Sequence, residues 1–170
     1  VYLGGRHELR LLDLAALTST TLLKDEFWDL NSDAPQFGPD DRHIVFAAMR
    51  NFERDLLVYD LETKKTTNLT NTGVTEAGPV WSPDGKYLYF YSNRTKPSYP
   101  FGVQDADLFR MALKATDAPF RSDKYQALFV QEEKPAANGK DSLKQKTPVQ
   151  IDLEYLSDRI EPIGPTFGYQ

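Results

Sequence analysis

Few side chains in this sequence combine the type and the spacing that chemistry requires. The 170 residues include two histidines, His7 and His43, and no cysteine, which excludes disulfides, thiolate nucleophiles and cysteine-ligated metals. The sequence has no Gly-x-Ser-x-Gly elbow, no His-Glu-x-x-His pair and no glycine-rich phosphate loop. We therefore assign no catalytic, cofactor-binding or metal-ligating residue, and we expect no cofactor.

Two aspartate-containing dipeptides and two glycosylation sequons have simpler explanations than ligand binding or glycosylation. Asp40-Asp41 could offer oxygen ligands to calcium, as could the acidic residue of Asp84-Gly85, but the twelve-residue donor series of an EF-hand is missing. We interpret both pairs as turns. The sequons at Asn68 and Asn93 lie in segments rich in Asn and Thr, where such triplets are expected from composition.

These turns belong to an internal repeat. Residues 35–46 align with residues 79–90 at an offset of 44. Residues 55–61 align with residues 107–113 at an offset of 52, so the second copy has eight extra residues. Residues 8–14 form a third, partial copy. A repeat of this length indicates stacked units of one kind.

Single positions of the repeat carry further predictions. Arg50 and Arg94 keep the offset of 44. His43 occupies the position of Tyr87, which predicts that it packs within a strand rather than acting in catalysis. His7 lies beside a pair of glycines and is expected at the surface.

Each unit predicts strands joined by a tight turn. In residues 82–86, proline presets φ near −65° and Gly85 accepts a positive φ. Asp41 occupies the Gly85 position in the first copy, and aspartate visits the left-handed region more readily than most residues. Residues 44–48 and 87–91 are apolar without a polar alternate, which is typical of strands covered on both faces.

Short gaps between these strands favour sheets stacked face to face over a parallel sheet covered by helices. The gap at residues 68–78 is rich in Asn, Thr and Gly and cannot supply a crossover helix. Residues 105–115 have helical spacing, but they align with the strand-like residues 56–61, and we assign a strand there. Short strands that recur about every 40–45 residues indicate an all-β fold of β-propeller blades, each a four-stranded antiparallel sheet.

The predicted organisation is a partial propeller within residues 1–130. Propellers need about 4–8 blades, so we expect the chain to be part of a larger protein. The expected parts are a partial blade at 1–24, a blade at 33–70, a blade at 77–130, a flexible charged linker at 131–147 and further propeller strand material at 148–170.

Charge and hydropathy limit the kinds of partner that the chain is expected to bind. The net charge is −5, with both signs scattered along the chain, which disfavours nucleic-acid binding. The longest apolar run, Ile44 to Met49, is far shorter than the roughly 18–20 residues that span a membrane. The insertion at residues 95–106 contains aromatic residues and prolines and could contact a peptide or a partner. The alternative is that it covers a sheet edge or contacts a neighbouring domain.

Two stretches resemble a known family. Residues 81–90, Trp-Ser-Pro-Asp-Gly-Lys-Tyr-Leu-Tyr-Phe, resemble the WD-like propeller repeat of TolB, tricorn-type proteases and prolyl oligopeptidase relatives. Residues 107–113, followed by residues 117–120, a charged linker and residues 150–160, resemble the propeller region of tricorn-like serine peptidases. The resemblance covers residues 35–163.

This resemblance implies a non-catalytic part of a serine peptidase. In that family the propellers are followed by a PDZ-like domain and a peptidase core, and no catalytic residue carries over to this chain. The implied role is to gate or direct peptides toward that core, with the PDZ-like and peptidase domains of the same protein as partners. A homo-oligomer and a periplasmic location are further expectations, with the cytoplasm as the alternative.

Two other readings stay open. A TolB-like propeller would bind a protein partner in the cell envelope without catalysis. An oligopeptidase of the α/β-hydrolase type with a propeller lid would require a Gly-x-Ser-x-Gly elbow further along the protein.

Overall fold

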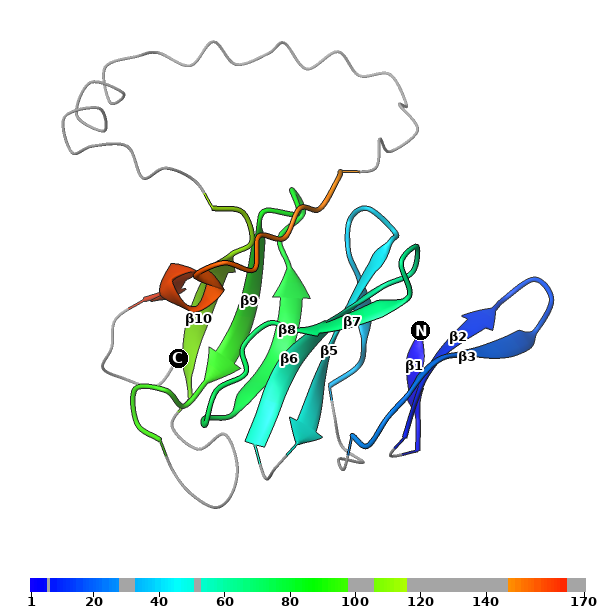
Figure 1. Cartoon of the computed structure of the whole chain (residues 1–170), viewed down its shortest axis with the longest axis horizontal. Coiled ribbons are helices and arrows are strands. Elements are labelled where there is room, and N and C mark those ends of the chain that lie inside the picture. Colours follow the sequence, from blue (N-terminus) through cyan, green and yellow to red (C-terminus); the bar gives the residue numbers. More distant parts are fainter. Residues whose placement is uncertain (6, 28–32, 51–52, 98–105, 116–146, 165–170) are drawn as a thin grey trace, which may run out of the picture.

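Three antiparallel sheets follow one another along the chain and stand side by side in Figure 1. The computed structural model describes residues 1–5, 7–27, 33–50, 53–97, 106–115 and 147–164. The first sheet has the order β1-β2-β3, the second β4-β5-β6-β7 and the third β11-β10-β9-β8. The strands are β1 Tyr2–Gly4, β2 Glu8–Asp13, β3 Thr18–Lys24, β4 Gln36–Phe37, β5 His43–Arg50, β6 Glu53–Asp60, β7 Lys65–Asn68, β8 Glu76–Trp81, β9 Tyr87–Ser92, β10 Asp107–Ala112 and β11 Ile160–Pro162.

This arrangement confirms the predicted all-β class with four-stranded antiparallel sheets. Every paired neighbour is antiparallel, and the second and third sheets have four strands each. Residues 107–112 form β10 in register with β9, so the strand assignment holds against the helical spacing.

The repeated turn has the same backbone in both copies. The N–H of Asp41 donates to the carbonyl of Gly38, and the N–H of Gly85 donates to the carbonyl of Ser82, both at 3.0 Å. Asp41 has a φ of 56° and Gly85 a φ of 67°. The left-handed residue that the repeat predicts is therefore present at both positions.

β5 lies at the centre of the described molecule. Its side chains alternate between two faces. Ile44 and Phe46 pack in a cluster with residues of the first sheet, whereas Val45 and Ala47 pack in a cluster with residues of the third sheet. All four are fully buried, which confirms the expectation of cover on both faces for this strand.

β9 differs from that expectation. Leu88 and Phe90 are fully buried against the second sheet, but Tyr91 is 48% exposed and Tyr89 is half-buried. The reason is that no following sheet packs on the tyrosine side within the described residues. The expectation that β9 is covered on both faces is therefore wrong for the face that carries Tyr89 and Tyr91, within the described residues.

The third sheet receives its fourth strand from late in the chain. Ile160 pairs with Met111, which places β11 beside β10, beyond the end of the interval 77–130 in which this blade was expected. Residues 116–146 lie outside the described residues, so the flexible linker expected at 131–147 stays a prediction.

A strap, defined here as residues 147–156, precedes β11. It passes the β8–β9 turn and the end of β10, as the orange segment in Figure 1 shows. Val149 and Leu156 are buried in the core between the second and third sheets. The N–H of Asp152 donates to the carbonyl of Leu113 at 2.9 Å. The 3-10 helix Leu156–Arg159 then leads into β11.

Candidate functional site

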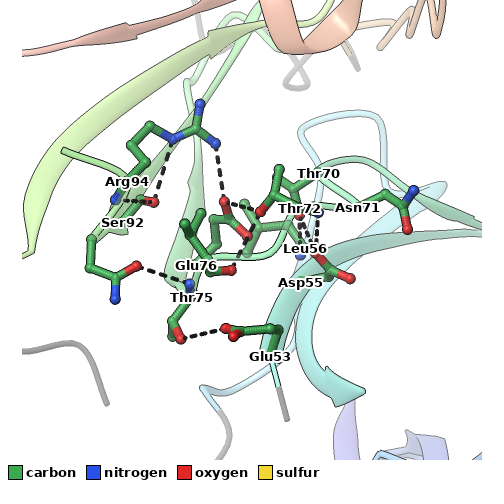
Figure 2. Close-up of polar contacts among 12 residues, drawn as sticks. Glu53, Asp55, Leu56, Thr70, Asn71, Thr72, Thr75, Glu76, Ser92 and Arg94 are labelled. Carbon is green, nitrogen blue, oxygen red and sulfur yellow. Dashed lines mark hydrogen bonds and ion pairs between the residues drawn. The ribbon is translucent and has the colours of Figure 1, made fainter. Parts of the chain in front are cut away.

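A buried polar network joins the second and third sheets at one end of the strands (Figure 2). Glu76, the first residue of β8, is fully buried. Its Oε1 accepts hydrogen bonds from Nη2 of Arg94 at 3.0 Å and from Oγ1 of Thr72 at 2.8 Å. The N–H of Thr72 donates to Oδ1 of Asp55 at 3.1 Å. Thr72 thus connects the carboxylates of the two sheets.

Burial sets the electrostatics of this network. It raises the pKa of Glu76, while the hydrogen bonds from Thr72 and Arg94 lower that pKa in part. Oε2 of Glu76 has no hydrogen-bond partner within the described residues. The Arg94 guanidinium also lies over the rings of Phe90 and Phe109, 5.8 and 5.2 Å from their centroids. Arg94 therefore stabilises both the carboxylate and the aromatic core.

The sequence marked one member of this network in advance. Arg94 is a repeat position, but Glu76 precedes the aligned block and falls opposite Ser32 at the offset of 44. The repeat therefore carries no signal for Glu76. No group of three or more His, Cys, Asp or Glu side chains in the described ranges could hold a metal ion.

A pocket of about 200 Å³ lies at the other end of the second sheet, beneath the strap. Its lining combines polar residues of the sheet with apolar residues of the strap. The lining residues are His43, Val58, Asp60, Thr63, Lys65, Thr67, Ile151 and Leu153. This volume is below the roughly 300–1,000 Å³ of drug-sized ligand sites.

The carboxylate in the lining of this pocket, Asp60, already forms an ion pair within the protein. Arg42 donates to both oxygens of Asp60, at 2.8 and 2.6 Å, and holds the pKa of Asp60 far below its usual range. Asp60 also accepts hydrogen bonds from Thr63. This carboxylate stabilises the β6–β7 turn and has little capacity left for a ligand.

His43 lies at the start of β5, the strand position that the repeat predicts. Its Nδ1 is 2.6 Å from Oδ2 of Asp40. Burial raises the pKa of Asp40, but the N–H groups of His43 and Arg42 and the imidazole outweigh burial, and the pKa is lowered. Asp40 therefore orients the imidazole and closes the turn. His7 is exposed, and its carbonyl accepts the N–H of Asp25.

Both sequon asparagines have structural partners. Asn93 is almost fully buried, and its Oδ1 accepts the N–H of Thr75 at 3.0 Å. Nδ2 of Asn68 donates to Oδ2 of Asp55 at 2.8 Å. Their amide groups thus hold the ends of strands in place.

The insertion at residues 95–106 is described only at its ends. Oγ1 of Thr95 donates to Oδ2 of Asp107 across the base of the insertion. Residues 98–105 lie outside the described residues, so the predicted contact with a peptide or partner stays a prediction. Within the described ranges, no helix is long and apolar enough to span a bilayer.

Comparison with known sequences gives a short match. No protein-family model matches the chain. The uncharacterized protein Atu1656 of Agrobacterium fabrum is 32% identical over 59 residues, which are 35% of this chain. The chain covers 20% of the length of that relative.

Comparison with solved structures shows the fold. TolB of Acinetobacter baumannii matches 62% of this chain at 26% identity with a TM-score of 0.50. A TolB-type protein of Agrobacterium tumefaciens matches 62% at 20% identity with a TM-score of 0.52. The tricorn protease matches 95% at 18% identity with a TM-score of 0.56. This chain covers 24%, 37% and 15% of those chains, respectively.

One structural assignment follows from the three sheets, from the turn that the second and third sheets share, and from these matches. The chain is similar in fold to the propeller-type proteins TolB and tricorn protease, and its sheets are the counterparts of propeller blades.

Proposed function

We propose that this chain is a non-catalytic β-propeller scaffold of a tricorn-like serine peptidase, and that it directs peptide substrates toward a peptidase core elsewhere in the same protein. Its sheets provide the rigid part of that assembly. The peptide-directing role, the PDZ-like and peptidase partners and the periplasmic location all belong to this proposal.

The observation that carries the proposal is the course of the chain after β10. Residues 1–115 are about two-thirds of the sequence, so a match to 95% of it must include most of the residues that follow β10. The tricorn protease matches over that larger share, whereas both TolB structures match 62%. The strap and β11 are the described elements in this later part.

The strap is held by the Asp-Arg-Ile segment that supports the tricorn resemblance. Nε of Arg159 donates to the carbonyl of Ala112 at 2.9 Å, and Nη1 donates to the carbonyl of Glu154 at 2.6 Å. Nη2 donates to the carbonyl of Asp152. One side chain thus ties the strap to β10 and aims the chain into β11.

A TolB-like propeller that binds a protein partner in the cell envelope is the second candidate. The observation that favours it is the 26% identity to Acinetobacter baumannii TolB, which exceeds the 18% identity to the tricorn protease. Both candidates share the scaffold and differ in whether a peptidase is attached.

The deciding experiment is a protease assay on the complete product of the gene that encodes this chain. We expect that product to degrade casein and a serine-directed covalent inhibitor to stop it, while the 170-residue chain alone degrades nothing. A complete product that is folded and fails to cleave casein would overturn the peptidase proposal and favour the TolB-like scaffold.

A further inference from the structure

A groove of about 700 Å³ lies where the strap enters the 3-10 helix Leu156–Arg159, the coil beside β10 in Figure 1. Its volume falls within the roughly 300–1,000 Å³ of ligand sites, unlike that of the smaller pocket at the second sheet. We propose that this groove binds a basic peptide segment, with a lysine or arginine side chain lying along Leu153 and Tyr155. The inference is independent of the proposed function.

The strap holds this groove on a fixed support. Val149 and Leu156 are buried in the core between the second and third sheets. Leu153 and Tyr155, which line the groove, are instead 56% and 70% exposed. The strap therefore anchors itself with one set of apolar side chains and presents a second set to solvent. Large exposed apolar side chains that share a groove are typical of an interaction surface.

The backbone at Tyr155 is unfavourable for a tyrosine. Its φ of 51° and ψ of 33° are left-handed, and no side chain caps the 3-10 helix that follows. A Cβ is strained in this conformation, whereas glycine is not. Because the side chain is mostly exposed, the fold gains little burial from it in return. Contact with a bound peptide gives the ring a role that folding does not.

The charge of the groove identifies its occupant. The carboxylates of Asp152, Glu154 and Asp158 line it together with one cation, Arg159. That guanidinium donates to four backbone carbonyls and so is committed to the fold. Among the residues that the structure describes, none of the three carboxylates forms an ion pair. Three carboxylates against one guanidinium leave the groove with a net charge of −2.

Exposed glutamates elsewhere in the described molecule are neutralised by the chain itself. Glu62 pairs with Arg42, and Glu161 pairs with Arg110. The carboxylates of the groove have no such internal partner, although exposed arginines are used freely on the sheets. A cation from another molecule supplies the missing charge.

A lysine or arginine side chain matches both properties of the groove. Its methylene stem is apolar and its head is cationic, so the stem can pack on Leu153 while the head meets Glu154 or Asp158. A guanidinium or ammonium also binds the face of a tyrosine ring, which Tyr155 offers. The groove has the volume of a drug-sized ligand site rather than of one side chain, which favours a peptide segment over a free amine.

The test measures binding of an end-capped fluorescent peptide of alternating arginine, leucine and glycine to the whole chain. We expect fluorescence anisotropy at low ionic strength to give a Kd of roughly 10–500 µM, and added salt to weaken it. Glu154→Gln should weaken binding about three- to fivefold, since one exposed charge is lost. Glu26→Gln makes the same change at an exposed residue outside the groove and should leave the Kd unchanged.

Tyr155→Gly separates binding from folding. Glycine accepts the left-handed backbone, so the midpoint of thermal unfolding should stay within about 3 °C of wild type. The Kd should nevertheless rise about fivefold or more, because the ring is lost. Full affinity in Tyr155→Gly would overturn the proposal.

Three further results would also overturn it. The first is no binding up to about 1 mM peptide. The second is equal binding of a peptide with glutamate in place of arginine. The third is an equal effect of Glu154→Gln and Glu26→Gln, because that would mean attraction to the net charge of the chain rather than to the groove. Circular dichroism verifies that each variant is folded.

Discussion

The second and third sheets are built from one repeat but are buried differently. Residues 44–48 of β5 are apolar and covered on both faces. Residues 87–91 of β9 are equally apolar, yet Tyr91 on one face is half-exposed within the described molecule. The comparison teaches that an uninterrupted apolar strand permits cover on both faces, whereas the neighbouring sheet decides whether that cover exists.

The turns of the two sheets show how the repeat tolerates a substitution. In the third sheet, Oγ of Ser82 accepts the N–H groups of the two residues that enter β9, at 3.1 and 2.9 Å. The second sheet has Gly38 there and no hydroxyl. Oδ1 of Asp40 accepts the two equivalent N–H groups instead, both at 3.0 Å. Oδ1 of Asp84, the equivalent of Asp40, also accepts the N–H of Lys86 at 3.1 Å, so the aspartate is common to both turns and the serine hydroxyl is added in the third sheet.

The largest effect should come from the equivalent phenylalanines of the two cores. Phe46 and Phe90 are both fully buried. Phe46→Ala and Phe90→Ala should each lower the free energy of unfolding by about 3–5 kcal/mol, because each leaves a cavity in a packed core. Urea denaturation of the whole chain measures both. A loss of less than about 1 kcal/mol for Phe90→Ala alone would show that the third sheet contributes little to the cooperative unit.

A smaller loss of unfolding free energy should follow when the ion pair between Arg94 and the buried Glu76 of the third sheet is broken. Arg94→Ala leaves the carboxylate of Glu76 buried with a hydrogen bond from Thr72, and should cost about 2–3 kcal/mol at pH 7. Because the pKa of Glu76 is raised in the folded protein, the protonated form is favoured there, and the loss should shrink as the pH falls.

The pH dependence has a matched control. A carboxyl whose pKa is raised by folding contributes stability below its unfolded pKa of about 4.5, and that stability is lost as the pH rises through the folded value. Glu76→Gln cannot titrate, so wild type should lose stability relative to Glu76→Gln from about pH 4.5 upward. An unfolding free-energy difference that stays constant with pH would contradict this role for Glu76.

The smallest effect should distinguish the two left-handed turn positions. A Cβ at Gly85 would lie 3.0 Å from Val149 of the strap, and its φ is 67°. Gly85→Asp should therefore destabilise the chain by about 1–2 kcal/mol, whereas Asp41→Gly should change stability by less than about 1 kcal/mol. Thermal unfolding of the two variants compares them. Equal losses would mean that the strap does not constrain the turn.

Local patterns predicted the strands and turns because those features depend on nearby residues. The repeat located β5, β6, β9 and β10 and the left-handed residue of each turn, including Asp41 in place of glycine. It also placed His43 at the start of a strand. The candidate network was harder to predict from the sequence. Glu76 meets Arg94 only when β8 pairs with β9, and the residue that the repeat places opposite Glu76 is a serine.

By itself, the sequence determined the all-β class, the strand positions and the tight turns, because alternation, proline, glycine and aspartate act on the backbone within a few residues. Tertiary structure alone decided which strand faces are covered, how β11 reaches β10 from 49 positions along the chain and which carboxylate meets Arg94. These outcomes depend on contacts between residues far apart in the sequence. Local preferences of the backbone do not specify such contacts, since each strand could bury either face against any suitable neighbour.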